Sequence, residues 1–99
     1  MIVRVFRARV HPGKDEEFRS FLAEAGVPMV TAAEGCTHVT VGESRWSDRP
    51  EFVVVTHWTS VTALRAFAGT DWQKAVIEPG EEHMLTETFC DHYETIETG

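Results

Sequence analysis

Hydrophobic residues along this chain change their spacing several times, and each change marks an expected element. Residues 2–10 and 51–58 are rich in β-branched and aromatic side chains, which favours strands. Residues 36–45 alternate loosely between apolar and polar, which predicts another strand, and residues 85–96 predict the last one. Ser, Asp, Arg and Pro at residues 47–50 predict the turn that joins two of these strands into a hairpin.

The first helical stretch follows the breakers at residues 11–13. We expect Asp15 to cap it, and its apolar residues then recur at helical spacing: Phe18, Phe21, Leu22 and Ala25. Gly26 and Pro28 are expected to interrupt or bend this helix, because proline has no amide hydrogen and restricts the residue before it. A further turn is expected over residues 29–33.

A second helix is predicted after the third strand. Ser60 is a suitable cap, one side carries Val61, Leu64, Phe67 and Ala68, and Gly69 lies where helices commonly stop. Asp71 is expected to cap a short third helix that ends at Pro79-Gly80.

The expected order is therefore strand, helix, strand, strand, helix, strand. Right-handed crossovers favour an antiparallel sheet ordered 4-1-3-2, with both main helices on one face. This is an α+β, ferredoxin-like βαββαβ fold, and 99 residues make one domain over residues 1–99.

The two central strands are apolar on both faces. Val3 and Val5 alternate with apolar neighbours in the first strand, as Val53 and Val55 do in the third. Helices cover only one face, and an uncovered apolar sheet face is larger than the patches that monomers usually expose. We therefore predict a homodimer that packs sheet against sheet, since the chain offers no long loop to cover the second face.

Charge and cysteine content narrow the class of protein. A formal net charge of −7 disfavours binding to nucleic acid or to an anionic membrane. Arginines interrupt the first strand, so it resembles neither a signal peptide nor a membrane span, and a cytoplasmic location is expected. Cys36 and Cys90 fall on opposite edge strands, roughly 14 Å apart, which is too far for a disulfide.

Several segments together resemble the antibiotic biosynthesis monooxygenase family of small dimeric α/β-barrel proteins. They are RVHPGKDEEF, EGCTHVTV, EFVVVTHWTSVTALRAFAGTDWQKA and the closing HYE, and the likeness covers nearly the whole chain. The resemblance implies the same fold that the periodicity predicts. It implies less about chemistry, because the family includes cofactor-independent oxygenases of polyphenols, quinol oxidases, haem-degrading enzymes and proteins with no known activity.

The haem-degrading branch of that family is the least compatible with this sequence. Its members use an Asn, a Trp and a haem-ligating His at positions that correspond here to Phe6, Phe67 and Ile77. None of these three side chains ligates iron or donates a hydrogen bond. A ligand from His83 would require the loop to shift.

Aromatic residues are dense where this fold places a space between sheet and helices. We expect them to form apolar walls around a ligand, with core packing as the alternative for each: Phe6, Trp58, Phe67 and Trp72. Arg7 is a candidate to stabilise an enolate or phenolate, or else to pair with Asp91 or Glu94. Tyr93 is either a donor to a ligand oxygen or a packing aromatic.

Two histidines are candidate bases. His57 and His92 lie on strands, and a histidine facing a cavity removes a phenolic or benzylic proton near neutral pH. Each is equally compatible with a packed histidine, and His38 is a weaker candidate. No spacing predicts a metal site, and the run Glu81-Glu82-His83 is interpreted as a solvated loop.

The sequence contains no nucleotide, flavin or nucleophile motif. The leading hypothesis is therefore a monooxygenase without metal or flavin, acting on a flat aromatic, anthrone-like or quinol-like molecule. The alternatives are a non-catalytic homodimer that binds a small aromatic ligand and, less favoured, a haem-binding protein.

Overall fold

The computed structural model of this chain describes residues 1–45, 48 and 50–98. The strands are β1 (Ile2–Val10), β2 (Cys36–Glu43), β3 (Glu51–Trp58) and β4 (Leu85–Glu94). The helical segments are α1 (Asp15–Phe21), the π-helical turn η1 (Leu22–Gly26), α2 (Val27–Thr31), α3 (Val61–Ala68) and the 3₁₀ turn η2 (Glu82–Met84). The sheet is antiparallel in the order β2-β3-β1-β4, which confirms the predicted topology.

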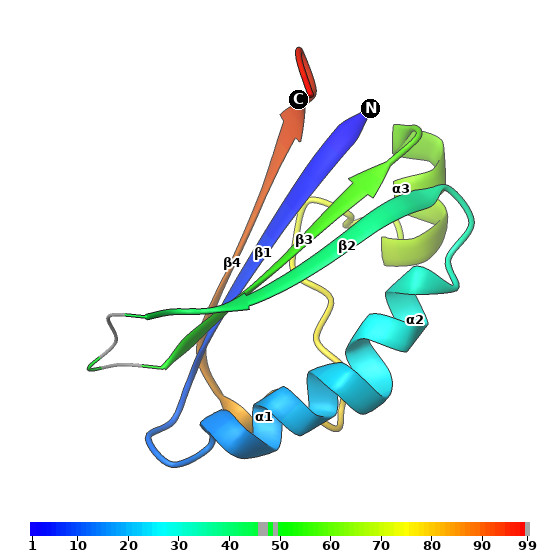
Figure 1. Cartoon of the computed structure of the whole chain (residues 1–99). Helices are drawn as coiled ribbons and strands as arrows, with labels where there is room; N and C mark the ends of the chain where they lie inside the picture. Colours follow the sequence, from blue (N-terminus) through cyan, green and yellow to red (C-terminus); the bar gives the residue numbers. More distant parts are fainter. Residues whose placement is uncertain (46–47, 49, 99) are drawn as a thin grey trace.

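One face of the sheet carries the core. The register of β1 places Arg4 beside Thr56 of β3 and His92 of β4. Because side chains alternate between the faces of a strand, the even-numbered residues of these strands share one face. The helices lie on this face (Figure 1), and six of its side chains are buried: Arg4, Ala8, Val10, Phe52, Thr56 and Trp58.

The core divides into two clusters along this face. The first packs the residues of α1 and η1 against the sheet and contains Ala8, Val10, Phe18, Leu22, Phe52 and Met84. The second joins α2 and α3 to the sheet through Val30, Trp58 and Leu64. Each fully buried side chain of this size contributes about 1.5–3 kcal/mol of burial free energy.

The first helical stretch differs from the prediction at its start and agrees with it at Pro28. Asp15 does not cap it: Lys14 is at the cap position, no side chain bonds to the free amides there, and Asp15 is the first helical residue. The three acidic residues of the first turn interact favourably with the helix dipole without a cap bond. Pro28 bends the helix rather than ending it, because the wider turn η1 before it relieves the missing backbone hydrogen bond.

The second helix agrees with its prediction. Ser60 caps α3, since its Oγ accepts a hydrogen bond from the amide of Ala63 at 3.1 Å. Gly69 ends the helix with φ of 91°, a conformation that favours glycine.

The predicted third helix after Asp71 is wrong. Residues 70–81 form turns and irregular backbone. The carbonyls of Trp72 and Lys74, which a helix would use internally, instead accept hydrogen bonds from the side chain of Arg4. Strand β4 ends at Glu94, two residues before the predicted end. Of the predicted turn at 47–50, Ser47 and Arg49 lie outside the described residues.

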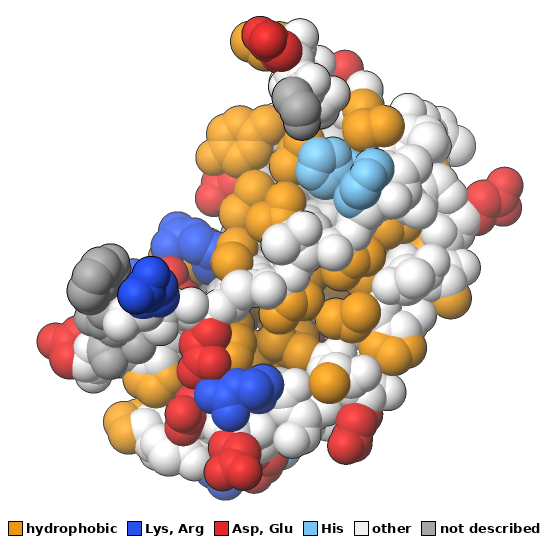
Figure 2. Space-filling model, in the orientation of Figure 1, with side chains coloured by type: hydrophobic (Ala, Val, Ile, Leu, Met, Phe, Trp, Pro, Cys, Tyr) orange, Lys and Arg blue, Asp and Glu red, His pale blue; other side chains and the backbone are white. Residues whose placement is uncertain are grey.

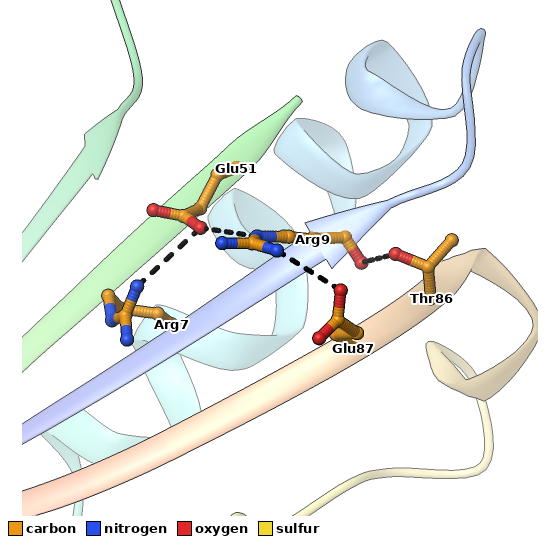
Figure 3. A network of polar contacts seen from close by, with 5 residues as sticks. All are labelled: Arg7, Arg9, Glu51, Thr86 and Glu87. Carbon is orange, nitrogen blue, oxygen red and sulfur yellow. Dashed lines mark hydrogen bonds and ion pairs between the residues drawn. The ribbon is translucent and has the colours of Figure 1, made fainter. Parts of the chain in front are cut away.

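The sheet face opposite the helices carries an ion-pair network at one end (Figure 3). Arg9 Nε is 2.9 Å from Glu51 and its NH1 is 3.1 Å from Glu87, while Arg7 lies 3.7 Å from Glu51. The arginine guanidinium groups also lie over the ring of Phe89. The partners predicted for Arg7 on β4, Asp91 and Glu94, were therefore wrong, because its ion-pair partner is Glu51 on β3, diagonal to it in the sheet.

The structure also bears on the expected absence of a disulfide and of a membrane span. Cys36 and Cys90 are free and lie on β2 and β4, at opposite edges of the sheet. Among the described residues, no helix is long and apolar enough to cross a membrane.

Candidate functional site

A cavity of about 80 Å³ lies between the sheet and the helical layer. Its walls come from β1, β3, α1, η1, α2, α3 and the segment 76–81, and its apolar lining includes Phe6, Phe21, Leu22, Val30, Val54 and Phe67. Hydrophobic side chains gather in the gap between β2 and the helices in Figure 2. Met29 lines the cavity while remaining 41% exposed, so the cavity reaches the surface beside α2.

The wall of this cavity includes a buried cation, the guanidinium of Arg4. Arg4 lines it from the centre of β1 and is only 5% exposed. Its guanidinium donates to the carbonyl oxygens of Trp72 and Lys74, and among the described residues it forms no ion pair. Burial lowers the pKa of Arg4, although the group stays protonated because an arginine pKa begins so high. The carbonyl dipoles therefore offset its charge only in part.

Arg4 also fixes the state of His92. Arg4 NH1 lies 2.9 Å from His92 Nε2. Since a guanidinium only donates, Nε2 must accept, and His92 is then neutral with its proton on Nδ1. Burial, and next the charge of Arg4, lower the pKa of His92, which agrees with the neutral form. The ring of His92 packs edge-on against Trp72 at 5.0 Å.

A buried carboxyl group lies on another wall. Glu81 is 4% exposed and lines the cavity from the segment before η2. Its Oε1 accepts a hydrogen bond from the amide of Glu78 at 3.0 Å. Burial is the main cause that raises the pKa of Glu81; the hydrogen bond from the Glu78 amide lowers it, and the charge of Glu78 raises it to a smaller extent. Both Arg4 and Glu81 are described residues, and no ion pair joins them.

A surface groove continues from the cavity. This groove has a volume of about 410 Å³ and is lined by Met29, Ala32, Ala33, Glu34, Ala63, Ala66 and Phe67 of α2, α3 and the segment after α2. Met29 and Phe67 line both spaces, so they form the boundary between the inner cavity and the outer groove. Between α2 and α3 the groove is lined largely by small alanine side chains.

The predicted aromatic walls take three different positions. Phe6 and Phe67 line the cavity. Trp58 is fully buried behind Phe67, with their rings 5.2 Å apart, and its indole nitrogen donates to Thr56 at 2.8 Å. Trp72 lies outside the lining and packs against His92. Two of the four aromatics thus meet the cavity directly.

The remaining predicted site residues lie on the opposite face of the sheet. His57 pairs across the strands with Val3 and contacts His38, with ring centroids 5.3 Å apart. Histidine side chains lie side by side near the ends of β2 and β3 in Figure 2. Arg7 stacks on Phe89 there, and Tyr93 is 59% exposed. The structure therefore brings His92 to the cavity side and leaves His57, Arg7 and Tyr93 on the other side.

Sequence reasoning missed Arg4 and Glu81. Arg4 had a usable signal, because it interrupts the apolar even-numbered positions of a central strand. Glu81 had none, since Glu81 and Glu82 look alike in sequence; the first is buried and the second is exposed. The interpretation of Glu81 as a solvated residue is corrected by its burial.

The cavity combines an apolar wall, a cation and a carboxyl group with a raised pKa. In a water-poor space such groups hold a developing anion and exchange a proton more effectively than in water. No group of three or more His, Cys, Asp or Glu side chains among the described residues is placed to hold a metal ion.

Comparison with known proteins identifies a family and solved structures with the same fold. The family model described as antibiotic biosynthesis monooxygenase matches residues 1–79. Among curated proteins no sequence matches the chain. Solved structures share its fold at low sequence identity.

Three of those structures are representative. A protein from Pseudomonas aeruginosa is 18% identical with a TM-score of 0.75, covering 97% of this chain and 94% of its own. SnoaB, a cofactor-independent oxygenase from Streptomyces nogalater, is 22% identical with a TM-score of 0.74, covering 98% and 94%. MhuD, solved as a mutant with two manganese protoporphyrin IX molecules per active site, is 19% identical with a TM-score of 0.74, covering 100% and 98%.

Proposed function

Since the chain belongs to the antibiotic biosynthesis monooxygenase family, we propose that it oxidises a small, flat aromatic molecule whose reacting end enters the cavity between its sheet and helices. The reaction would need neither metal nor flavin. The observation that carries this proposal is the pairing of an apolar cavity with the buried guanidinium of Arg4, which forms no ion pair with any described residue. Such a site attracts a substrate that becomes an oxyanion while its rings stay in an apolar environment.

The size of the cavity limits how a substrate binds. An engineered apolar cavity of about 150 Å³ holds benzene, so about 80 Å³ is too small for even one ring without movement. The adjoining groove offers about 410 Å³. A multi-ring substrate would therefore lie mainly in the groove and place its reacting end past Phe67 and Met29 toward Arg4.

The proposed reaction balances with dioxygen as the only oxidant. A methylene group activated by neighbouring aromatic rings loses a proton, and the electron pair left behind reduces dioxygen. One oxygen atom enters the product as a carbonyl and the other leaves as water. The protein contributes desolvation, positioning and stabilisation of the anion.

The positions of His92 and His57 limit how either histidine could act as the base. His92 is on the cavity side and neutral, but its unprotonated Nε2 accepts a hydrogen bond from Arg4. His92 would accept a proton only if Arg4 turned away, so in the resting arrangement it orients the guanidinium. His57 lies on the opposite face and reaches a ligand only if that face also forms a site.

Two alternative functions remain as competing proposals. A non-catalytic binding protein would use the same cavity and groove, and it requires nothing beyond their apolar lining. Haem binding is supported less, because no His, Cys or Tyr is among the described residues that line the cavity.

We also propose that the chain acts as a homodimer through the sheet face opposite the helices. That face carries Val3, Val5, Val53, Val55 and Phe89, all half-buried within one chain, and Tyr93, which is exposed. The helices cover the other face (Figure 1). A second copy is the partner that buries this surface without any further segment.

The test of function measures dioxygen uptake with anthrone as the probe, in chelator-treated buffer. We expect uptake above the spontaneous rate, with one dioxygen consumed for each anthrone whose methylene group becomes a second carbonyl. Replacing Val54 with Phe fills the cavity and should abolish the excess uptake, whereas Val41→Phe on exposed β2 should leave it unchanged.

Other outcomes separate the alternatives. Binding of anthrone without oxygen uptake would favour the non-catalytic role. A Soret band on haem titration that disappears in Val54→Phe would favour haem binding. Unchanged turnover in the double variant His57→Ala, His92→Ala would exclude both histidines as the base.

A further inference from the structure

We propose that Glu81 is the base that takes the proton from the substrate, while Arg4 holds the negative charge that results. This inference rests on the proposed oxidation and names the residue that begins it. Glu81 and Arg4 line one cavity from separate elements, the segment before η2 and strand β1. A ligand between them meets both groups.

The contacts of Glu81 leave it able to accept a proton. A carboxylate has about four acceptor sites, and the amide of Glu78 occupies one of them on Oε1. That bond closes a short turn, because the amide of Glu81 also donates to the carbonyl of Glu78 at 3.0 Å. These two hydrogen bonds hold the Glu81 carboxyl group in a fixed orientation at the cavity wall.

Burial explains why Glu81 is a stronger base than an exposed glutamate. Burial raises its pKa, and this outweighs the hydrogen bond from the Glu78 amide, which lowers it. Arg4 lies in the same cavity but forms no ion pair with it, and so does not lower that pKa by direct contact. On the outer side of the segment, His83 Nε2 lies 2.7 Å from a carboxylate oxygen of Glu17 in α1. His83 therefore pairs with Glu17 and not with Glu81.

The site therefore selects a substrate by acidity as well as by shape. The proton moves from a C–H or O–H bond of the substrate to a Glu81 oxygen, and the electron pair of that bond stays on the substrate. A hydroxylated or ketone-bearing aromatic spreads this pair onto an oxygen, where the Arg4 guanidinium stabilises it. Unactivated hydrocarbons would bind without reacting.

The first test compares Glu81→Gln with Glu82→Gln, using anthrone and following kcat/KM against pH. Glutamine keeps an oxygen for the Glu78 amide and cannot take the proton. We expect wild type and the exposed control Glu82→Gln to show the same rise in rate with pH, with its midpoint above 4.5, the ordinary value for glutamate. Glu81→Gln should lose this rise and react about 10²-fold more slowly. An unchanged pH profile in Glu81→Gln would overturn the proposal.

The second test needs no substrate and follows the urea midpoint against pH. A raised pKa in the folded state means that folding favours neutral Glu81. Its contribution to stability is complete below pH 4.5 and is lost as pH rises through the folded pKa. Glu81→Gln should therefore gain stability relative to wild type as pH rises above 4.5, and Glu82→Gln should not.

The two tests fail separately. If wild type does not oxidise anthrone but Glu81→Gln gains stability relative to wild type above pH 4.5, the proposed oxidation of this probe is wrong, while Glu81 is confirmed as a buried acid. If Glu81→Gln leaves that pH dependence unchanged, Glu81 does not titrate as a buried acid and its role as the base is wrong.

Discussion

Arg4 shows how one residue connects the sheet, an irregular segment and the cavity. It is a buried cation whose partners are two carbonyl oxygens and a neutral imidazole. Burying a charge is expensive unless hydrogen bonds satisfy it. The cost is reduced here because Trp72 and Lys74 contribute backbone oxygens that a helix would have used internally. The same arrangement leaves the positive charge available to an anion in the cavity.

The state of His92 gives a prediction at this scale. A lowered folded pKa means that the unfolded chain binds a proton more readily, so stability is present above pH 6.5, the ordinary value, and is lost as pH falls through the folded pKa. Replacing His92 with Gln keeps an acceptor for Arg4 and removes the titration. Urea midpoints of His92→Gln should therefore depend less on pH below 6.5 than those of wild type.

The control for this prediction is His11→Gln, an exposed histidine in the loop after β1. It should keep the wild-type dependence on pH. If His92→Gln and His11→Gln follow the same curve, the contact between Arg4 and His92 does not hold the imidazole neutral.

Residue chemistry was only partly predictable from sequence. Spacing identified Phe6 and Phe67 as residues of the helix-covered space, because apolar positions follow strand and helix periods. It did not resolve which face of β3 holds His57 and which holds Trp58, since both faces of a central strand are apolar here. Burial of Glu81 depends on how residues 76–81 fold back over the cavity, and no local pattern encodes that path.

At the scale of elements, strands and the capped helix α3 followed their sequence patterns closely. Bounds agreed where strong local signals exist, as at Ser60 and Gly69. The segment after α3 did not, because Asp71, Ala75 and Val76 fit a short helix locally while Arg4 competes for its carbonyls from a distant strand. Tertiary contacts outweighed a weak local preference there.

The junction of β2 and α3 yields a prediction for elements. Gly35 has φ of 89°, and a Cβ added to it would lie 2.4 Å from the Cβ of Ala63. Gly13 has a similar φ of 86° with no atom within 4 Å of an added Cβ. Gly13→Ala should lose about 1–2 kcal/mol from backbone strain alone, and Gly35→Ala should lose about 1–3 kcal/mol more from overpacking.

Urea denaturation of both variants measures the difference. Because the strain is matched, the excess loss in Gly35→Ala reports the close approach of β2 to α3. Equal losses in the two variants would show that α3 shifts freely, and the groove between α2 and α3 would then have no fixed width.

For the whole molecule, the two sheet faces carry different side chains. The helix-covered face holds the cavity, Arg4 and His92. On the opposite face, half-buried valines lie between the network of Arg7, Arg9, Glu51 and Glu87 at one end and the histidine pair at the other. Charged and titratable groups at both ends of an apolar centre resemble the rim of a protein interface. They would fix the register of a second copy, while the valines supply the buried area.

Disrupting that centre tests the homodimer. Val55 is directly opposite Val5 in the sheet, and Val55→Glu would place a charge in the middle of the proposed interface. An unpaired charge buried in an interface costs several kcal/mol, so sedimentation at micromolar concentration should shift from dimer to monomer. Val41→Glu, on β2 and 39% exposed, should remain a dimer, and circular dichroism should show both variants folded. A wild-type chain that sediments as a folded monomer would contradict the shared sheet face, yet it would leave the cavity at Arg4 intact, because every residue of that cavity comes from one chain.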